Sequence, residues 1–298
     1  MKHIILFSLL TFFCAMMCHG QRREIQQRLD SLANAANAKV GIAIVTGDSV
    51  IAEVNGDVPF PLSSVFKFPL AMAVLDSLQK ACKPASMTTE ILRSEILHDT
   101  WSPMRNKYPS GDISLPVGEL IDFAMTQSDN NAADILLSRF GGCETVNRFL
   151  HTAGCDTARL HVHATEAEMH ADPKKAYRNL GTPVECARLA LHLVDRPLLK
   201  GWNRRWLIRL MTECATGTER LPKHLKDKVF MLGHKTGTGF EDNKGRITGV
   251  NDMGFIIPFN GNPIGIAVYV TDAAMPLQEA EHIIAEAGRI LSSELPPL

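Results

Sequence analysis

The sequence lacks several features that would point to other classes of protein. Its 31 basic and 32 acidic residues give a net charge of -1, so no basic excess favours nucleic acid or an anionic membrane as a partner. It contains no Cys-x-x-Cys pair, which argues against a zinc ribbon or a thioredoxin-type site. Its 298 residues and 45% apolar content are ample for a large core. We therefore expect a globular protein with a small-molecule ligand.

Long apolar runs are also scarce, with one exception at the N-terminus. Residues 4–17 form a short apolar run between a basic start and a polar segment, which is typical of a secretory signal peptide. We expect cleavage after Gly20, secretion to the periplasm and no stable membrane span, because the run is short for a transmembrane helix. An uncleaved anchor is one alternative. A lipid attached to Cys18 is another, although Met17 is bulky for the residue before such a site.

The seven cysteines do not suggest a fold organised by disulfides. Two of them, Cys14 and Cys18, fall within the predicted signal peptide, and the other five are an odd number. At least one thiol is therefore unpaired unless it pairs between chains.

Apolar periodicity separates the two ends of the chain from its middle. Strand patterns cover residues 40–45, 49–54, 229–235, 246–258 and 264–271, whereas helical patterns cover 23–36, 65–78, 117–125, 132–139, 183–194 and 277–292. We predict an α/β (α+β) fold with an antiparallel five-stranded sheet covered by the terminal helices and an inserted all-α domain. The expected division is 1–20 signal peptide, 21–60 plus 214–298 α/β domain, and 61–213 all-α domain, with the active site where the two parts join.

Ser64 and Lys67 lie three residues apart at the start of a predicted helix. Serines and Pro61 before an apolar run are typical of a helix N-terminus, and this spacing places both side chains on one side of the first turn. If the flanking phenylalanines desolvate Lys67, its neutral form can accept the proton of Ser64. Taken alone, the motif fits a helix cap and a snorkelling lysine better.

Ser128, Asp129 and Asn130 stand between two helical runs. All three residue types favour helix caps, which is the better interpretation of the motif in isolation. The same hydroxyl, carboxylate and amide can also donate and accept hydrogen bonds around a substrate.

Lys235, Thr236, Gly237 and Thr238 follow an apolar strand pattern. A strand that ends in lysine, threonine and glycine can bring a cation and a hydroxyl to a ligand carboxylate while its backbone approaches closely. A strand that runs into a glycine-rich hairpin is an equally good interpretation. Phosphate binding has little support, because no glycine-rich phosphate-binding motif surrounds the segment.

The order of the three motifs decides between these interpretations. S-x-x-K, S-D-N and K-T-G occur together in class A β-lactamases and penicillin-binding proteins, and each stands here in the expected context of helix start, interhelical turn and strand end. The sequence resembles a class A serine β-lactamase over nearly the whole mature chain, and more closely the cephalosporin-directed, extended-spectrum branch. The resemblance implies hydrolysis of penicillins and cephalosporins through a serine acyl-enzyme, conferring antibiotic resistance, by a monomer without a cofactor.

The resemblance also implies roles for individual residues. It implies Ser64 as nucleophile, Lys67 or Glu166 with a water as its base, Ser128 as proton relay, Asn130, Lys235, Thr236, Gly237 and Thr238 as substrate-binding residues, and the amides of Ser64 and Thr238 as oxyanion hole. Glu166 would then activate the water that releases the product. In isolation a glutamate in a polar segment is normally solvated, and Glu168 is the competing assignment.

Four features depart from the pattern of the family. His170 replaces a frequent asparagine and Ala164 a frequent arginine, so the placement of water and the anchoring of the loop are in question. Ser63 stands where the disulfide-bearing carbapenemases have cysteine, so carbapenem hydrolysis is not implied. Residues 240–249 predict a longer hairpin that widens the site for bulky substrates.

Other functions remain as alternatives. His161 and His163 suggest a metal site, but the further ligands of a metallo-β-lactamase are missing, and we expect no metal. A penicillin-binding D,D-peptidase shares the three motifs, but Glu166 argues against it. A sensor would need a second domain or a membrane span, and a glutaminase-like amidase does not explain the segment around Glu166.

Overall fold

The structure is a computed structural model that describes residues 20 and 22–295. Residues 1–19 of the predicted signal peptide, including Cys18, therefore lie outside the described residues. Within the described part, no helix is both long and apolar enough to cross a membrane.

The centre of the molecule is a five-stranded antiparallel sheet with the strand order β2-β1-β10-β9-β8. Its strands are β1 (Lys39–Thr46), β2 (Ser49–Val54), β8 (Met231–Thr238), β9 (Val250–Ile257) and β10 (Ile264–Thr271). The sheet joins the two ends of the chain, because β1 pairs with β10 with Ala43 opposite Ala267. The predicted antiparallel sheet is confirmed, and β8 forms one of its edges.

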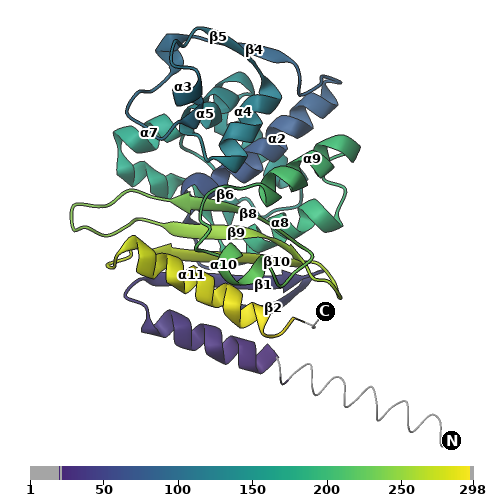
Figure 1. Ribbon diagram of the computed structural model, residues 1–298, viewed down its shortest axis with the longest axis vertical. Coiled ribbons are helices and arrows are strands. Elements are labelled where there is room, and N and C mark those ends of the chain that lie inside the picture. Colours follow the sequence, from purple (N-terminus) through teal and green to yellow (C-terminus); the bar gives the residue numbers. More distant parts are fainter. Residues whose placement is uncertain (1–19, 21, 296–298) are drawn as a thin grey trace, which may run out of the picture.

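Two terminal helices cover one face of the sheet, as predicted. They are residues 22–35 and α11 (Leu277–Ser292), and Figure 1 shows both on the same side of the sheet. Ile42 and Ile44 of β1 pack with them in one buried core. Ala43 and Val45 belong to a second core, because successive side chains of a strand point to opposite faces.

A helical region covers the other face of the sheet (Figure 1). Its helices are η1 (Ser63–Phe66), α2 (Lys67–Lys80), η2 (Arg93–Glu95), α3 (Pro103–Lys107), α4 (Val117–Thr126), α5 (Asn130–Arg139), α6 (Gly142–Thr152), α7 (Glu166–Ala171), η3 (Pro173–Arg178), α8 (Pro183–Asp195) and α9 (Gly201–Thr212), and α10 (Pro222–Leu225) follows near α11. Helix α8 packs against β1 and β10. The second core therefore lies between the sheet and α2, α4, α5 and α8.

The middle of the chain is not all-helical, and this part of the prediction is wrong. It also contains the short strands β3 (Phe60–Pro61), β4 (Thr88–Ile91), β5 (Ile113–Pro116), β6 (Leu160–His161) and β7 (Leu180–Gly181). Strands of two to four residues are too short to produce the alternation of apolar and polar residues from which a strand is recognised. The proposed domain boundaries stay a prediction.

The segment between β8 and β9 forms a small hairpin of its own. Glu241 bridges to Ile247, and the Asp242 carboxylate accepts hydrogen bonds from the backbone N–H groups of Lys244 and Arg246. Arg246 also forms an ion pair with Asp242 at 2.6 Å. Because this hairpin interrupts the ladder, β9 begins at Val250 and not at the predicted residue 246.

Candidate active site

The three sequence motifs meet where the edge strand β8 passes the start of the helical region. Ser64 lies in η1, Lys67 begins α2, Ser128 lies in the turn between α4 and α5, and Asn130 begins α5. Lys235 reaches them from β8. A cleft of about 560 Å³ opens beside Ser64 and Asn130. The folded chain thus brings together residues that are distant in the sequence, as the prediction of a site at the junction requires.

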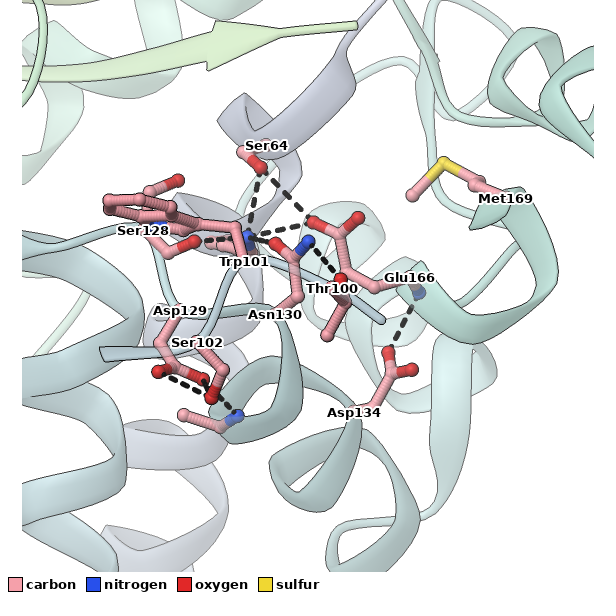
Figure 2. A network of polar contacts seen from close by, with 12 residues as sticks. Ser64, Thr100, Trp101, Ser102, Ser128, Asp129, Asn130, Asp134, Glu166 and Met169 are labelled. Carbon is pink, nitrogen blue, oxygen red and sulfur yellow. Dashed lines mark hydrogen bonds and ion pairs between the residues drawn. The ribbon is translucent and has the colours of Figure 1, made fainter. Parts of the chain in front are cut away.

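The side chain of Lys67 contacts four of the residues that are labelled in Figure 2. Its Nζ is fully buried and lies 2.8 Å from Ser64 Oγ, 2.8 Å from the Ser128 carbonyl oxygen, 2.5 Å from Asn130 Oδ1 and 2.7 Å from Glu166 Oε1. An ammonium group has only three N–H donors. Four acceptors therefore compete for three protons, which is an arrangement suited to proton transfer.

Glu166 contacts both Ser64 and Lys67. The Ser64 hydroxyl donates to Glu166 Oε1 at 3.1 Å while it accepts from Lys67. Glu168 instead points back to the N-cap of α7, where its carboxylate accepts from the Thr165 N–H in a capping box. Of the two competing glutamates, the structure therefore places Glu166 at the serine.

Asp134 holds the backbone of Glu166, and sequence reasoning missed it. Its two carboxylate oxygens accept from the N–H groups of Glu166 and Ala167, each at 2.7 Å, and Figure 2 shows the first of these hydrogen bonds. Burial raises the pKa of Asp134 to about 6, although these two hydrogen bonds lower it. A signal existed in the sequence, because Asp134 lies four residues after Asn130 and therefore on the same face of α5.

Asn179 anchors the loop that carries Glu166. Its side-chain oxygen accepts from the N–H groups of His163 and Ala164, at 2.7 and 2.8 Å, and its amide donates to the Ala164 carbonyl. The Asn179 carbonyl oxygen also accepts from the Leu62 N–H, just before the nucleophile segment. The loop is therefore anchored by the Asn179 side chain, although Ala164 stands where the family frequently has an arginine.

We expect Asn179→Ala to destabilise this loop and to lower the catalytic rate. The substitution leaves two backbone N–H groups and one carbonyl without their buried partner, which corresponds to a loss of about 3 kcal/mol. Hydrogen exchange should increase in residues 162–179, and kcat should fall about 10-fold or more because Glu166 loses its position. Asn106→Ala, at an exposed position of α3, is the control. Equal exchange in the two variants would contradict the anchoring role.

Asp129 and its two neighbours have different structural roles. The buried Asp129 carboxylate caps α5 through the Ala132 N–H and also accepts from the Met104 N–H. Ser128 has a positive φ of 59°, a conformation that is rare outside glycine and typical of functional sites. The capping interpretation therefore holds for Asp129, while Ser128 and Asn130 face Lys67.

Lys235 is fully buried next to Ser128. Its Nζ donates to Ser128 Oγ at 2.9 Å and to the Thr236 carbonyl oxygen at 2.8 Å. Burial lowers the pKa of Lys235 to about 8, and the nearby charge of Lys67 contributes to the lowering. Ser128 therefore lies between two lysine side chains, with Lys67 at its carbonyl and Lys235 at its hydroxyl.

Gly237 allows β8 to approach the nucleophile segment. A Cβ atom at this position would lie 2.7 Å from the Leu62 carbonyl oxygen and 3.0 Å from the Ser64 nitrogen. Arg220, a buried residue that sequence reasoning missed, donates to the Gly237 carbonyl oxygen at 3.0 Å and to Thr238 Oγ1 at 2.6 Å. An isolated arginine in a polar segment left no signal in the sequence.

The walls of the cleft come from separate segments. Trp101, which is 63% exposed, lines it together with His170 of α7 and Phe240 of the hairpin after β8.

The two histidines that suggested a metal site lie next to each other. The rings of His161 and His163 contact each other with centroids 4.9 Å apart. The described residues contain no group of three or more side chains that could hold a metal ion.

The fold and the site define a serine hydrolase that works through an acyl-enzyme, because a serine hydroxyl lies between an amine and a carboxylate. The model of the β-lactamase enzyme family matches residues 23–295. The chain therefore belongs to this family and is a class A serine β-lactamase, which hydrolyses the β-lactam ring. This confirms the resemblance that the three motifs predicted.

Similar proteins are found among both sequences and structures. A β-lactamase of Bacteroides uniformis is 34% identical over 97% of both chains. The β-lactamase VEB-1 of Pseudomonas aeruginosa is 31% identical over 97% of this chain and 96% of its own. The crystal structure of a class A β-lactamase from Bacteroides cellulosilyticus has a TM-score of 0.86 and 34% identity, and it covers 92% of this chain and 97% of its own.

Proposed function

We propose that β-lactam hydrolysis proceeds through a covalent adduct on Ser64 and that Glu166 activates the water that removes it. The observation that carries the proposal is the position of Ser64 Oγ, 2.8 Å from Lys67 Nζ and 3.1 Å from Glu166 Oε1. A serine becomes nucleophilic when an adjacent base takes its proton. Both candidate bases are within hydrogen-bond distance of this proton.

In acylation, Ser64 Oγ attacks the lactam carbonyl and its proton passes to the Lys67–Glu166 pair. The backbone N–H groups of Ser64 and Thr238 stabilise the oxyanion, since the close approach of β8 at Gly237 brings the two segments together. Ser128 then gives a proton to the departing ring nitrogen. The proton that Ser64 gave up returns to Ser128 from the Lys67–Glu166 pair, which leaves Glu166 ionised. Lys235 stays charged and orients the Ser128 hydroxyl through its hydrogen bond to Ser128 Oγ.

In deacylation, Glu166 acts as general base. Ser64 Oγ becomes an ester oxygen and no longer has a proton to donate, so Glu166 Oε1 becomes available to a water molecule. This water attacks the ester carbonyl as Glu166 takes its proton. The bond to Ser64 Oγ then breaks, and Ser64 Oγ recovers a proton from the Lys67–Glu166 pair. Mass spectrometry of enzyme mixed with a cephalosporin tests the scheme. A short-lived adduct on Ser64 supports it, whereas a long-lived adduct favours a penicillin-binding D,D-peptidase.

Substrate recognition follows from the polar groups around the cleft. Lys235 and Thr236 bind the substrate carboxylate by charge and hydrogen bonding. Asn130 meets the side-chain amide of the substrate, and its own amide is oriented by Thr100 Oγ1 at 2.8 Å (Figure 2). The exposed ring of Trp101 offers an apolar wall at the rim.

We further propose an extended-spectrum activity, since relatives with that description include the enzyme PER-1 of Pseudomonas aeruginosa, 30% identical over 94% of this chain. The hairpin after β8 supports this, because Gly239 and Phe240 line the cleft. Deletion of residues 242–245 should lower kcat/KM for a bulky oxyimino-cephalosporin about 10-fold. Benzylpenicillin, which is smaller, should change less than about 3-fold and serves as the internal control. Equal losses for both substrates would contradict this role of the hairpin.

Residues 1–20 support a further proposal, export to the periplasm with removal of the segment. A basic start and a short apolar run are what the secretion machinery recognises. Cell fractionation and the mass of the mature protein test it. An activity that stays in the membrane fraction with a lipid on Cys18 would favour the alternative.

A further inference from the structure

A short irregular segment, residues 97–100, forms part of one wall of the active-site cleft. His98, Asp99 and Thr100 line the cleft, and Trp101 follows them in the same wall. The segment lies between η2 and α3 and belongs to neither a helix nor a strand. Its backbone carbonyl groups therefore depend on hydrogen-bond donors from other parts of the chain.

Arg105 of α3 supplies these donors. Its Nη1 atom donates to the carbonyl oxygens of Leu97, His98 and Thr100, at 3.2, 2.5 and 2.9 Å. Among the described residues, no other group donates to the carbonyl oxygens of His98 and Thr100. Hydrogen bonds from a charged guanidinium are stronger than those between neutral groups. One side chain thus holds the backbone of the whole segment.

Other contacts hold the chain at the two ends of this segment. At one end the Leu97 N–H donates to the side-chain oxygen of Asn131 at 2.8 Å. Beyond the other end the Trp101 indole N–H donates to the Gln127 carbonyl oxygen, also at 2.8 Å. Residues 98–100 lie between these anchors, and the position of their backbone depends on the guanidinium.

The segment carries the residue that orients the Asn130 amide. Thr100 Oγ1 accepts from Asn130 Nδ2 at 2.8 Å (Figure 2), while Asn130 Oδ1 accepts from Lys67 Nζ at 2.5 Å. A carboxamide nitrogen has two N–H groups, so one binds Thr100 and the other can donate to a substrate. Because both ends of the amide are held, the direction of this second N–H is fixed.

We propose that Arg105 is a positioning residue for substrate recognition and that it acts through Thr100 on Asn130. The inference rests on the proposed role of Asn130, which is to meet the side-chain amide of the substrate. Without the guanidinium, the carbonyl groups of residues 97–100 lose their common donor and the segment can move away from α5. Thr100 Oγ1 then no longer fixes the Asn130 amide. Substrates that present an amide to Asn130 therefore lose more than substrates that lack one.

The test compares two substrates that differ in this amide. Benzylpenicillin carries a side-chain amide, whereas 6-aminopenicillanic acid has a free amine in its place. For R105Q we expect kcat/KM to fall about 10-fold with benzylpenicillin and less than about 3-fold with 6-aminopenicillanic acid, because one hydrogen bond to the amide is misplaced. R205Q, the same substitution at an exposed position of α9, is the matched control and should behave like the wild type.

A double-mutant cycle tests the route through Thr100. T100V removes the acceptor hydroxyl while Arg105 stays intact, so it should cause the same loss of preference for benzylpenicillin. Because both substitutions break one chain of contacts, the double variant R105Q/T100V should be no worse than R105Q alone. Additive losses would overturn the proposal, since Arg105 would then act by another route. If R105Q does not fold, R105K takes its place, because an ammonium group does not reproduce the planar donor set of a guanidinium.

Equal losses for the two substrates in R105Q, or no loss for either, would also overturn the proposal. N130A separates this failure from failure of the proposed function. A preference for benzylpenicillin that falls in both N130A and R105Q supports the inference. A preference that falls in N130A and not in R105Q overturns the role of Arg105 alone, whereas an unchanged preference in N130A overturns the roles of both residues.

Discussion

Ser64→Ala should lower kcat/KM for a chromogenic cephalosporin by about 10⁴-fold or more, and no covalent adduct should form. The hydroxyl removed by the substitution is the one that lies between Lys67 Nζ and Glu166 Oε1. The remaining groups can still bind the substrate and polarise its carbonyl, but they have no nucleophile to activate. Losses of this size are typical when the nucleophile of an acyl-transfer enzyme is removed.

Ser63→Ala is the matched control for this experiment. Ser63 precedes the nucleophile, and its buried hydroxyl has no hydrogen-bond partner among the described residues. Acylation should therefore persist in S63A. Hydrolysis that survives in S64A, or adduct formation on a different peptide, would refute Ser64 as the nucleophile.

Glu166→Ala should separate the two halves of the reaction. Deacylation should slow by about 10²- to 10⁴-fold, the usual contribution of a general base, so the Ser64 adduct should accumulate. The acylation rate of this variant should also fall if Glu166 takes the serine proton. It should fall less if Lys67 alone takes that proton. Rapid-mixing mass spectrometry over time measures both rates in one experiment.

Glu168→Ala is the control for Glu166. It removes a carboxylate from the same short helix, but one that is bound to the Thr165 N–H and 3.5 Å from Lys175 Nζ. The Ser64 adduct should remain short-lived in E168A. Accumulation in E168A and not in E166A would reverse the assignment, and accumulation in neither would require another base.

The stability of the fold should depend on pH through the Asp134 carboxyl group. Its pKa is raised to about 6 in the folded protein, mainly by burial, compared with about 3.9 for a free aspartate. A raised pKa favours the protonated form in the fold, so this stabilisation is complete below about pH 4 and is lost as the pH rises through 6. Above pH 6 the charged carboxylate holds the N–H groups of Glu166 and Ala167 at the expense of some stability.

Much of the fold could be predicted because its periodic signals are local. The strand at residues 264–271 and the helix at 277–292 were predicted with their observed ends, since alternation and helical spacing persist through both. The short strands β3, β6 and β7 were missed, because two residues cannot establish a period. They form only where distant segments meet, as Phe60 does with Gly181.

The residues of the active site differ in the same way: those in local motifs could be predicted, and those that act through distant contacts could not. The motif residues were recognised because each motif is contiguous in the sequence and occurs in a definite context of helix or strand. They are Ser64, Lys67, Ser128, Asn130 and Lys235. Glu166 was found from its place between two motifs, and only the structure separates its position from that of Glu168. The supporting residues have no such pattern. Each acts through contacts with segments far away in the chain, as Arg220 does with β8.

The sequence by itself therefore determined the class of fold, the nucleophile motif and the chemistry that this motif supports. Periodicity and short motifs depend only on residues that are close together in the sequence. Only the tertiary structure decided how Glu166 is held, what replaces the missing arginine at Ala164, and that Arg220 supports β8 at Gly237. These depend on distances between side chains from different elements. Such distances are set by packing of the two cores against the sheet, which no local pattern records.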